Sequence, residues 1–211
     1  EGKSLFELTA ERNKAVVDEL MVVGNSDHIE WSRDLLKDID LPKTFVTETI
    51  ARNTAAAIAF AALAVEADDV LIITPSDHLI QNQEAYEKSL LEAVELAKKD
   101  FVVTFGVIPT KPETGYGYIE FEGKDVLSFR EKPNTETAQE FLDRGTFLWN
   151  SGMFCFKAGV LLDELKKYQP EVFEKSLEAW EKSENNLLDE ASCKHIPSIS
   201  IDYAVMERSK Q

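Results

Sequence analysis

Short runs of β-branched and other apolar residues alternate with helical stretches along most of this chain of 211 residues. Apolar runs of about four to eight residues between turn residues are typical of buried strands, and apolar spacings of about three and four are typical of helices. Alternation of the two predicts an α/β fold with helices on both faces of a sheet.

The expected strands and helices follow from this pattern and from its turn residues. Strands are expected at residues 21–24, 44–48, 70–74, 101–108, 116–121, 126–129 and 153–156. Helices are expected at residues 4–16, 27–39, 53–67, 84–99, 135–144, 158–168, 171–182 and 202–208. The hairpin pattern between residues 116 and 129 predicts an antiparallel insertion, so we expect a Rossmann-like, mixed and mainly parallel sheet.

Composition excludes several classes of protein. Apolar residues make up 44% and charged residues 29%, which favours a sizeable core over disorder. The net charge of −16 opposes binding to nucleic acid and to anionic membranes. The longest apolar run, residues 55–65, is shorter than the roughly 20 residues that a membrane span needs. Cys155 and Cys193 lie far apart and suit reduced thiols in the cytoplasm.

A carboxylate follows one of the buried strands. Asp77 comes after the predicted strand 70–74 and after Pro75. Ligands of open α/β sheets bind beyond the carboxyl ends of strands, where a Mg2+ ion bound to phosphate could use this carboxylate. An Asp here is also typical of a residue that caps the next segment, and the pattern leaves both interpretations open. The three histidines are too scattered to predict a zinc site.

A charged pair, Glu131 and Lys132, follows the predicted strand 126–129 and precedes Pro133. The Lys ammonium is a compact positive charge that suits a phosphate group, and an acidic chain has a reason to keep one in a cleft. A surface ion pair before a turn is the alternative interpretation.

Two glycine-containing stretches precede predicted strands. Residues 115–118 read Gly-Tyr-Gly-Tyr, and Gly117 allows a ligand to approach the main chain closely. Residues 149–152 read Trp-Asn-Ser-Gly and include Asn150. Each stretch is also typical of an ordinary turn, so neither indicates a site alone.

The link between strand 44–48 and the next helix holds four further candidates. Free N–H groups at a helix N-terminus favour anions, and a Glu carboxylate can accept two hydrogen bonds from guanine, which adenine cannot donate. Capping of the helix by Asn or Thr is the alternative. The candidates are Glu48, Arg52, Asn53 and Thr54.

The motifs of dinucleotide-binding, P-loop and serine-hydrolase proteins are absent from the sequence. The ordered set of segments resembles instead the sugar-1-phosphate nucleotidyltransferases. The segments occur in the order of the family, which makes the set more specific than any single segment, and the resemblance spans roughly residues 4–208. Its segments are Arg52-Asn53-Thr54-Ala55, Pro75-Ser76-Asp77-His78, residues 112–119, Glu131-Lys132-Pro133, residues 149–154 and residues 200–207.

The resemblance implies the nucleotide-diphospho-sugar transferase fold and an activity. The chain is most similar to the members that act on mannose 1-phosphate, so the expected substrates are GTP and mannose 1-phosphate. The sugar phosphate would attack the α-phosphorus of GTP in line, with no covalent enzyme intermediate, to give GDP-mannose and pyrophosphate. Such a transfer depends on positioning and charge neutralisation.

The resemblance also implies roles for the candidate residues. Asp77 is expected to hold the catalytic Mg2+, and Lys132 to bind the sugar phosphate, so these two are the expected catalytic residues. The remaining candidates are expected to bind substrate: Glu131 at the sugar hydroxyls, Gly117 and Asn150 in the sugar pocket, and Glu48, Arg52, Asn53 and Thr54 at the guanine end.

Two departures from the family pattern limit these implications. The Gly-rich phosphate loop is expected before Ser4 and a second metal-binding Asp after Glu207, and the sequence contains neither. We therefore expect residues 1–211 to form a single nucleotidyltransferase domain that is incomplete at both ends and nearly inactive by itself. A fused mannose-6-phosphate isomerase domain, as bacterial members often have, and a homodimer are left open.

Two other functions also remain open. The chain could be a related nucleotidyltransferase for another sugar phosphate or nucleotide. It could also be a regulatory protein that binds a nucleotide sugar without catalysis, because fold alone does not confer chemistry.

Overall fold

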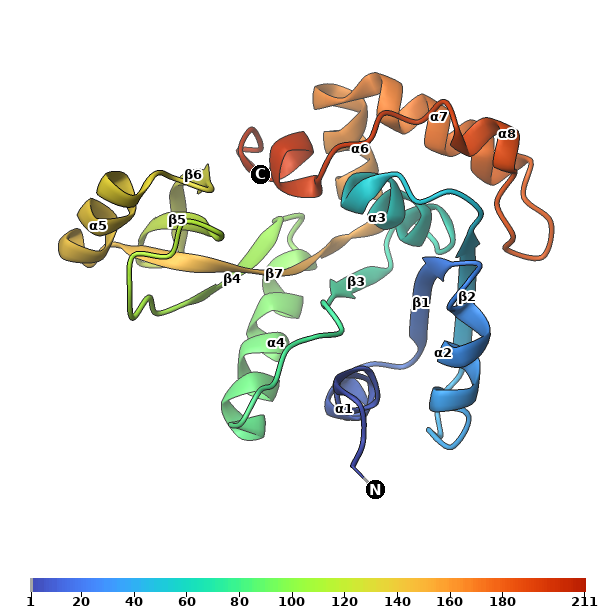
Figure 1. Ribbon diagram of the computed structural model, residues 1–211, viewed down its shortest axis with the longest axis horizontal. Helices are drawn as coiled ribbons and strands as arrows, with labels where there is room; N and C mark the ends of the chain where they lie inside the picture. Colours follow the sequence, from blue (N-terminus) through green and yellow to red (C-terminus); the bar gives the residue numbers. More distant parts are fainter. Residues whose placement is uncertain (1) are drawn as a thin grey trace.

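A computed structural model describes residues 2–211 (Figure 1). Its strands are β1 (Leu20–Asn25), β2 (Lys43–Glu48), β3 (Val70–Ile73), β4 (Val103–Val107), β5 (Gly117–Glu122), β6 (Asp125–Glu131) and β7 (Phe147–Lys157). Its helices are α1 (Leu5–Asn13), α2 (Ile29–Leu36), α3 (Asn53–Leu63), α4 (Gln83–Ala97), α5 (Thr135–Arg144), α6 (Ala158–Tyr168), α7 (Pro170–Glu181), α8 (Glu190–Cys193) and the π-helical turn η1 (Asp202–Met206). Alternation of strands and helices confirms the expected α/β class.

The strands form a parallel pair, β1–β2, and a five-stranded sheet around β7. Strands β3, β4 and β5 all pair antiparallel with β7, and β6 pairs antiparallel with β5. Because β4 shares partner residues on β7 with both β3 and β5, it must lie on the opposite edge of β7 from them. Strands β3, β4 and β5 therefore run in the same direction as one another. Each of them is antiparallel to β7, the strand with which it pairs.

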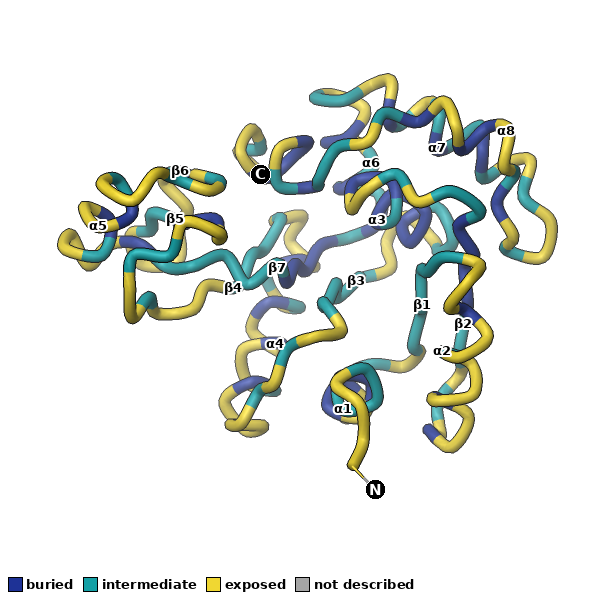
Figure 2. Tube along the Cα trace, viewed as in Figure 1, coloured by how far each residue is buried: buried dark blue, intermediate teal, exposed yellow. Residues whose placement is uncertain are grey.

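Helices cover both faces of this sheet, as expected. Alternate residues of a strand point to opposite faces. Phe154 and Phe156 of β7 pack in the cluster that contains α3 and α6, whereas Met153 and Cys155 pack toward α4. Figure 2 shows the buried part of β7 at the centre of the molecule.

Helix α3 joins the two sheets. It contacts β1 and β2 as well as α6 and α7, and it lies beside all four in Figure 1. Ala55, Ala56, Ala59 and Ala62 are fully or almost fully buried. Small side chains let neighbouring main chains approach closely, which explains an alanine-rich sequence here. In residues 2–211, every helix is too short or too polar to cross a bilayer.

Strand β7 is longer than the expected strand 153–156. Its first half contains Asn150 and Gly152, which resemble turn residues in the sequence. Gly106 and Val107 of β4 pair with Asn150 and Trp149, and this pairing keeps the first half extended. Helix α8 was not expected from the sequence because it is only four residues long.

Candidate active site

An opening in the sheet forms the centre of the candidate site. On one edge of β7, β3 pairs with one end and β5 with the other, so among the described strands residues 150–153 have no partner on that edge. A Cβ atom placed on Gly152 would lie 3.4 Å from the Pro75 ring, and one placed on Gly117 would lie 3.2 Å from the Asn150 Cβ atom. The segment after β3 and the start of β5 therefore meet at this opening.

Four of the predicted residues lie together there. The β5–β6 register places Gly117 opposite Glu131, and any Cβ at Gly117 would collide with the Glu131 carboxylate. Lys132 Nζ lies 3.1 Å from Glu131 Oε1. The Glu131 side chain is only 9% exposed, whereas that of Lys132 is 58% exposed. With Asn150, these residues combine a buried carboxylate, an amide and an accessible cation.

Asp202 of η1 and Glu207, the residue that follows η1, complete this cluster. Asn150 Nδ2 donates a hydrogen bond to Asp202 Oδ1 at 2.8 Å. The main-chain N–H of Glu131 donates to Glu207 Oε1 at 3.2 Å. Sequence reasoning matched this segment to the family without giving Asp202 or Glu207 a role. No local pattern could have done so, because the chain must fold before residue 202 meets residue 150.

The charges of the cluster shift one another's protonation. Burial raises the pKa of the Glu131 carboxyl, and the nearby charges of Asp202 and Glu207 raise it further. Burial also raises the pKa of the Asp202 carboxyl. The Glu131 carboxylate raises the pKa of the Lys132 ammonium, which stays charged. Three carboxylates beside one ammonium make this region acidic, so a phosphate bound there needs further positive charge.

Asp77 follows β3 in an exposed loop beside the opening. Its side chain is 81% exposed and lies 3.8 Å from the His78 ring. Helix α4 is capped by Asn82, whose side chain accepts the N–H of Ala85 at 3.0 Å, so Asp77 does not cap that helix. Arg12 of α1 holds the loop by donating to the His78 carbonyl at 3.1 Å.

The donor set at Asp77 fits a magnesium ion. Mg2+ takes only one or two carboxylates and completes its shell with phosphate oxygens and water. An accessible carboxylate beside the opening meets that need. In residues 2–211 no group of three or more His, Cys, Asp and Glu side chains could hold a metal by itself, so the fit depends on oxygens from the substrate.

The predicted guanine-binding residues lie at a different place, where β2 meets α3. The Glu48 side chain is buried, with 6% of the residue exposed, and its Oε1 atom has no hydrogen-bond partner among the described residues. Burial raises the pKa of the Glu48 carboxyl to about 7, and the main-chain N–H of Arg52 offsets this only in part. This buried oxygen can therefore accept a hydrogen bond from a group that enters this place.

The start of α3 is held by the segment that leads into η1. Arg52 Nε donates to the Ile196 carbonyl at 2.6 Å, and Thr54 Oγ1 accepts the N–H of Ile201 at 2.9 Å. The Asn53 carboxamide accepts the N–H of Thr54 at 2.8 Å. The expected cap by Asn53 or Thr54 is wrong, because the N-cap residue of α3 is Arg52 and no side chain makes a capping hydrogen bond there. Thr54 instead fastens α3 to the residue before Asp202.

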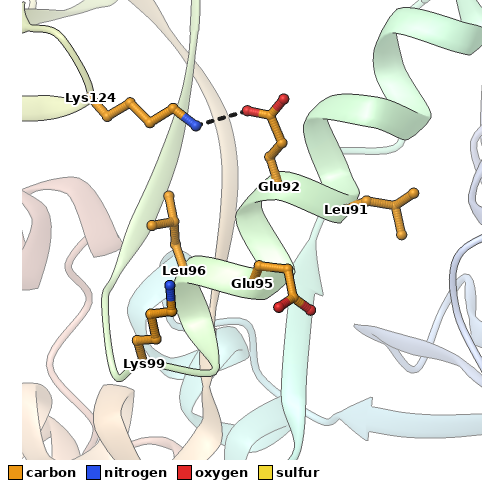
Figure 3. Close-up of a pocket in the computed structure, with 6 residues that line it drawn as sticks. All are labelled: Leu91, Glu92, Glu95, Leu96, Lys99 and Lys124. Atoms are coloured by element: carbon orange, nitrogen blue, oxygen red, sulfur yellow. Dashed lines mark hydrogen bonds and ion pairs between the residues drawn. The ribbon is translucent and has the colours of Figure 1, made fainter.

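Two surface hollows lie elsewhere, between α4 and the sheet. One, of about 370 Å³, is lined by residues of α4, by Lys99 just after it and by Lys124, whose Nζ lies 2.9 Å from Glu92 Oε2 (Figure 3). The other, of about 280 Å³, adjoins it between α4 and strands β4 and β5. None of the predicted site residues lines either hollow. The candidate site is therefore identified from its charged and polar side chains and not from the shape of the surface.

Comparison with known proteins decides the family. The family model described as nucleotidyl transferase matches residues 1–191. The chain belongs to the nucleotidyl transferase family. This membership confirms the resemblance found in the sequence, and it identifies a family of enzymes.

Relatives of this nucleotidyl transferase carry related names. The mannose-1-phosphate guanylyltransferase of Escherichia coli is 38% identical over 209 residues, which cover 90% of this chain and 44% of that protein. The xanthan biosynthesis protein XanB of Xanthomonas campestris is 40% identical over 201 residues, which cover 90% of this chain and 43% of that protein. The chain thus spans less than half the length of these relatives.

A solved structure shows the same fold at high similarity. It is described as the crystal structure of mannose-6-phosphate isomerase from Helicobacter pylori, with a TM-score of 0.94 and 43% identity. The match covers 99% of this chain and 86% of that one.

Proposed function

We propose that this protein transfers GMP from GTP to mannose 1-phosphate, giving GDP-mannose and pyrophosphate. The observation that supports the proposal is the opening beside residues 150–153, where Pro75, two residues before Asp77, lies next to Gly152, and where Asn150 lies next to Gly117 in the cluster with Glu131 and Lys132. The name of the Escherichia coli relative supports the same reaction.

The residues of the cluster would bind and orient the sugar phosphate. Lys132 would leave its ion pair with Glu131 and bind the phosphate, since its side chain is exposed enough to move. Glu131 would accept hydrogen bonds from sugar hydroxyls, and Asn150 would donate one. Holding the phosphate oxygen at a fixed position for attack is the main contribution that such residues can make to phosphoryl transfer.

Asp77 would hold the magnesium ion. When bound, Mg2+ supplies positive charge that neutralises phosphate oxygens. The accessible carboxylate on a loop anchored by Arg12 supports this role.

Glu48 would select the base of the nucleotide. Its buried, unpartnered oxygen can accept from the N1–H and amino groups of guanine once the carboxyl is ionised. Arg52, Asn53 and Thr54 follow Glu48 at the start of α3 and would contact the nucleotide there.

The test is the release of pyrophosphate by the full protein with mannose 1-phosphate and Mg2+, measured in turn with GTP, dTTP, UTP and ATP. We expect a clear preference for GTP. A preference for another nucleotide would instead favour a different nucleotidyltransferase, and binding of nucleotide sugar without any turnover would favour a regulatory protein.

The proposal extends to the setting of the protein. The two cysteines are free and buried, which supports the predicted cytoplasmic location. The single domain over residues 1–211 and the homodimer remain predictions, which limited proteolysis and light scattering of the full protein can test.

A further inference from the structure

We propose that the turn η1 positions the sugar-phosphate pocket, with Asp202 fixing the carboxamide of Asn150 and Glu207 fixing the main chain at Glu131 and Lys132. Both acids act through other residues, so they are positioning residues. The inference rests on the proposed function and adds a specificity element to the same site.

Asp202 determines which way the Asn150 carboxamide points. Asn150 Oδ1 accepts the N–H of Gly152 at 3.0 Å, and Nδ2 donates one hydrogen to Asp202 Oδ1 at 2.8 Å. The second Nδ2 hydrogen then remains available for a ligand. Asn150 is thereby fixed as a donor toward the sugar.

Glu207 fixes the end of β6. Its Oε1 atom accepts the N–H of Glu131 at 3.2 Å, and the next N–H, that of Lys132, donates to the Tyr116 carbonyl at 3.2 Å. Lys132 has a φ of +47°, in the left-handed region that non-glycine residues seldom adopt. Such a conformation persists only when its surroundings hold it. The two bonds supply that restraint at the base of the ion-paired Glu131 and Lys132 side chains.

The π-helical turn separates two acids that reach the pocket at different places, Asp202 at Asn150 and Glu207 at Glu131. The N–H of Glu207 donates to the Asp202 carbonyl at 2.9 Å, which closes the wide turn. Ala204 and Val205 between them are fully buried and anchor the turn in the core. The bond from Ile201 to Thr54 fixes the residue before Asp202 to the start of α3. Wide turns of this kind occur frequently at functional sites.

The combined result is a pocket that offers one fixed donor, Asn150, and one fixed acceptor, Glu131. A hydroxyl can satisfy both only at a set position on the sugar ring. We therefore assign to Asp202 and Glu207 a part in selecting the sugar, although neither needs to touch it.

The first test is free of substrate. Amide NMR of the full protein should show that Asp202→Ala shifts the side-chain amide signals of Asn150 and speeds their exchange, while the Glu131 main-chain signal stays in place. Glu207→Ala should shift the Glu131 main-chain signal and leave the side-chain amide signals of Asn150 in place. The inference is overturned if neither variant moves its assigned signal, or if both variants move both signals equally.

The second test is kinetic. Asp202→Ala and Glu207→Ala should each raise the KM for mannose 1-phosphate about tenfold, the size expected from one lost orienting hydrogen bond, with the KM for GTP unchanged. Asp202→Asn and Glu207→Gln keep an acceptor oxygen and should recover most of the affinity. Asp125→Asn, at the exposed far end of β6, is the matched control for loss of an acidic charge.

The inference is overturned if the Ala and amide variants raise the KM for mannose 1-phosphate equally. It is also overturned if the variants raise the KM for GTP instead. Failure of the wild-type protein to use mannose 1-phosphate would overturn the proposed function. The NMR comparison separates the two, because it detects the positioning contacts whatever the substrate is.

Discussion

At the scale of single residues, Glu48 is the most informative group. A carboxyl with one buried oxygen unpartnered reduces stability when it ionises, and burial raises its pKa from 4.5 to about 7. The protein keeps this arrangement at the start of α3, where a base that donates two hydrogen bonds would satisfy the carboxylate. An energetic cost in the free protein is thus consistent with a binding role.

Replacing Glu48 by Gln should change how stability depends on pH. The folded protein holds the Glu48 proton up to about pH 7, while the unfolded chain releases it near the ordinary pKa of 4.5. The free energy of unfolding should therefore fall as pH rises between those values, by up to about 3 kcal/mol. Glu48→Gln should remove this part of the slope in urea titrations at several pH values. An identical slope in the variant would show that Glu48 ionises normally.

Gly117 gives a second prediction at this scale. A methyl group there would collide with the Glu131 carboxylate and press on Asn150. Gly117→Ala should raise the KM for the sugar phosphate about tenfold or more, because overpacking costs about 1–3 kcal/mol and here displaces binding groups. Gly115→Ala is the matched control, since its Cβ would meet only the Glu113 side chain at 3.4 Å. Equal kinetics for the two variants would contradict the proposed place of Gly117.

At the scale of elements, α1 acts as a brace for the loop after β3. Arg12 is 7% exposed and donates to the His78 carbonyl and to the Thr9 hydroxyl. Its guanidinium also lies 5.1 Å from the centre of the Tyr86 ring. A long-range contact from a buried arginine can fix a loop that has few apolar contacts of its own.

Arg12→Ala should loosen this loop and weaken metal binding at Asp77. We expect a loss of about 2–3 kcal/mol in the free energy of unfolding, because the carbonyl of His78 loses a charged donor. The Mg2+ concentration for half-maximal turnover should rise roughly fivefold or more. Arg33→Ala removes a comparable contact with the Phe45 ring, at 4.3 Å, far from the loop. Arg33→Ala should lower the free energy of unfolding and leave the Mg2+ concentration for half-maximal turnover unchanged. A rise in that concentration in both variants would contradict the role of Arg12.

The sequence predicted elements well where one local pattern dominates. The strand 70–74 and the helix 84–99 follow from apolar periodicity and agree with β3 and α4 within a residue or two. The first half of β7 was missed because polar residues and a glycine there are held extended by β4, a partner some 40 residues away. A tertiary pairing of that kind leaves no trace in the local sequence.

At the scale of the whole molecule, the site joins segments that are far apart in the chain. Sequence motifs identified Gly117, Glu131, Lys132 and Asn150, and the structure brings these together. Asp202 and Glu207 could not be assigned in advance, because their roles depend on how η1 docks against β6 and β7. Motif reasoning finds residues with reactive groups, whereas it misses those that act by holding others.

The central claim is that Asp77 and Lys132 serve the same phosphate transfer, and a double-mutant cycle tests it most directly. Turnover of GTP and mannose 1-phosphate with Mg2+ would be compared for the full wild-type protein, Asp77→Asn, Lys132→Met and the double variant, with circular dichroism to verify folding. We predict that each single variant loses about 100- to 1,000-fold in kcat and that the double variant loses far less than the product of the two. Strictly multiplicative losses, or unchanged turnover in Asp77→Asn, would contradict the account.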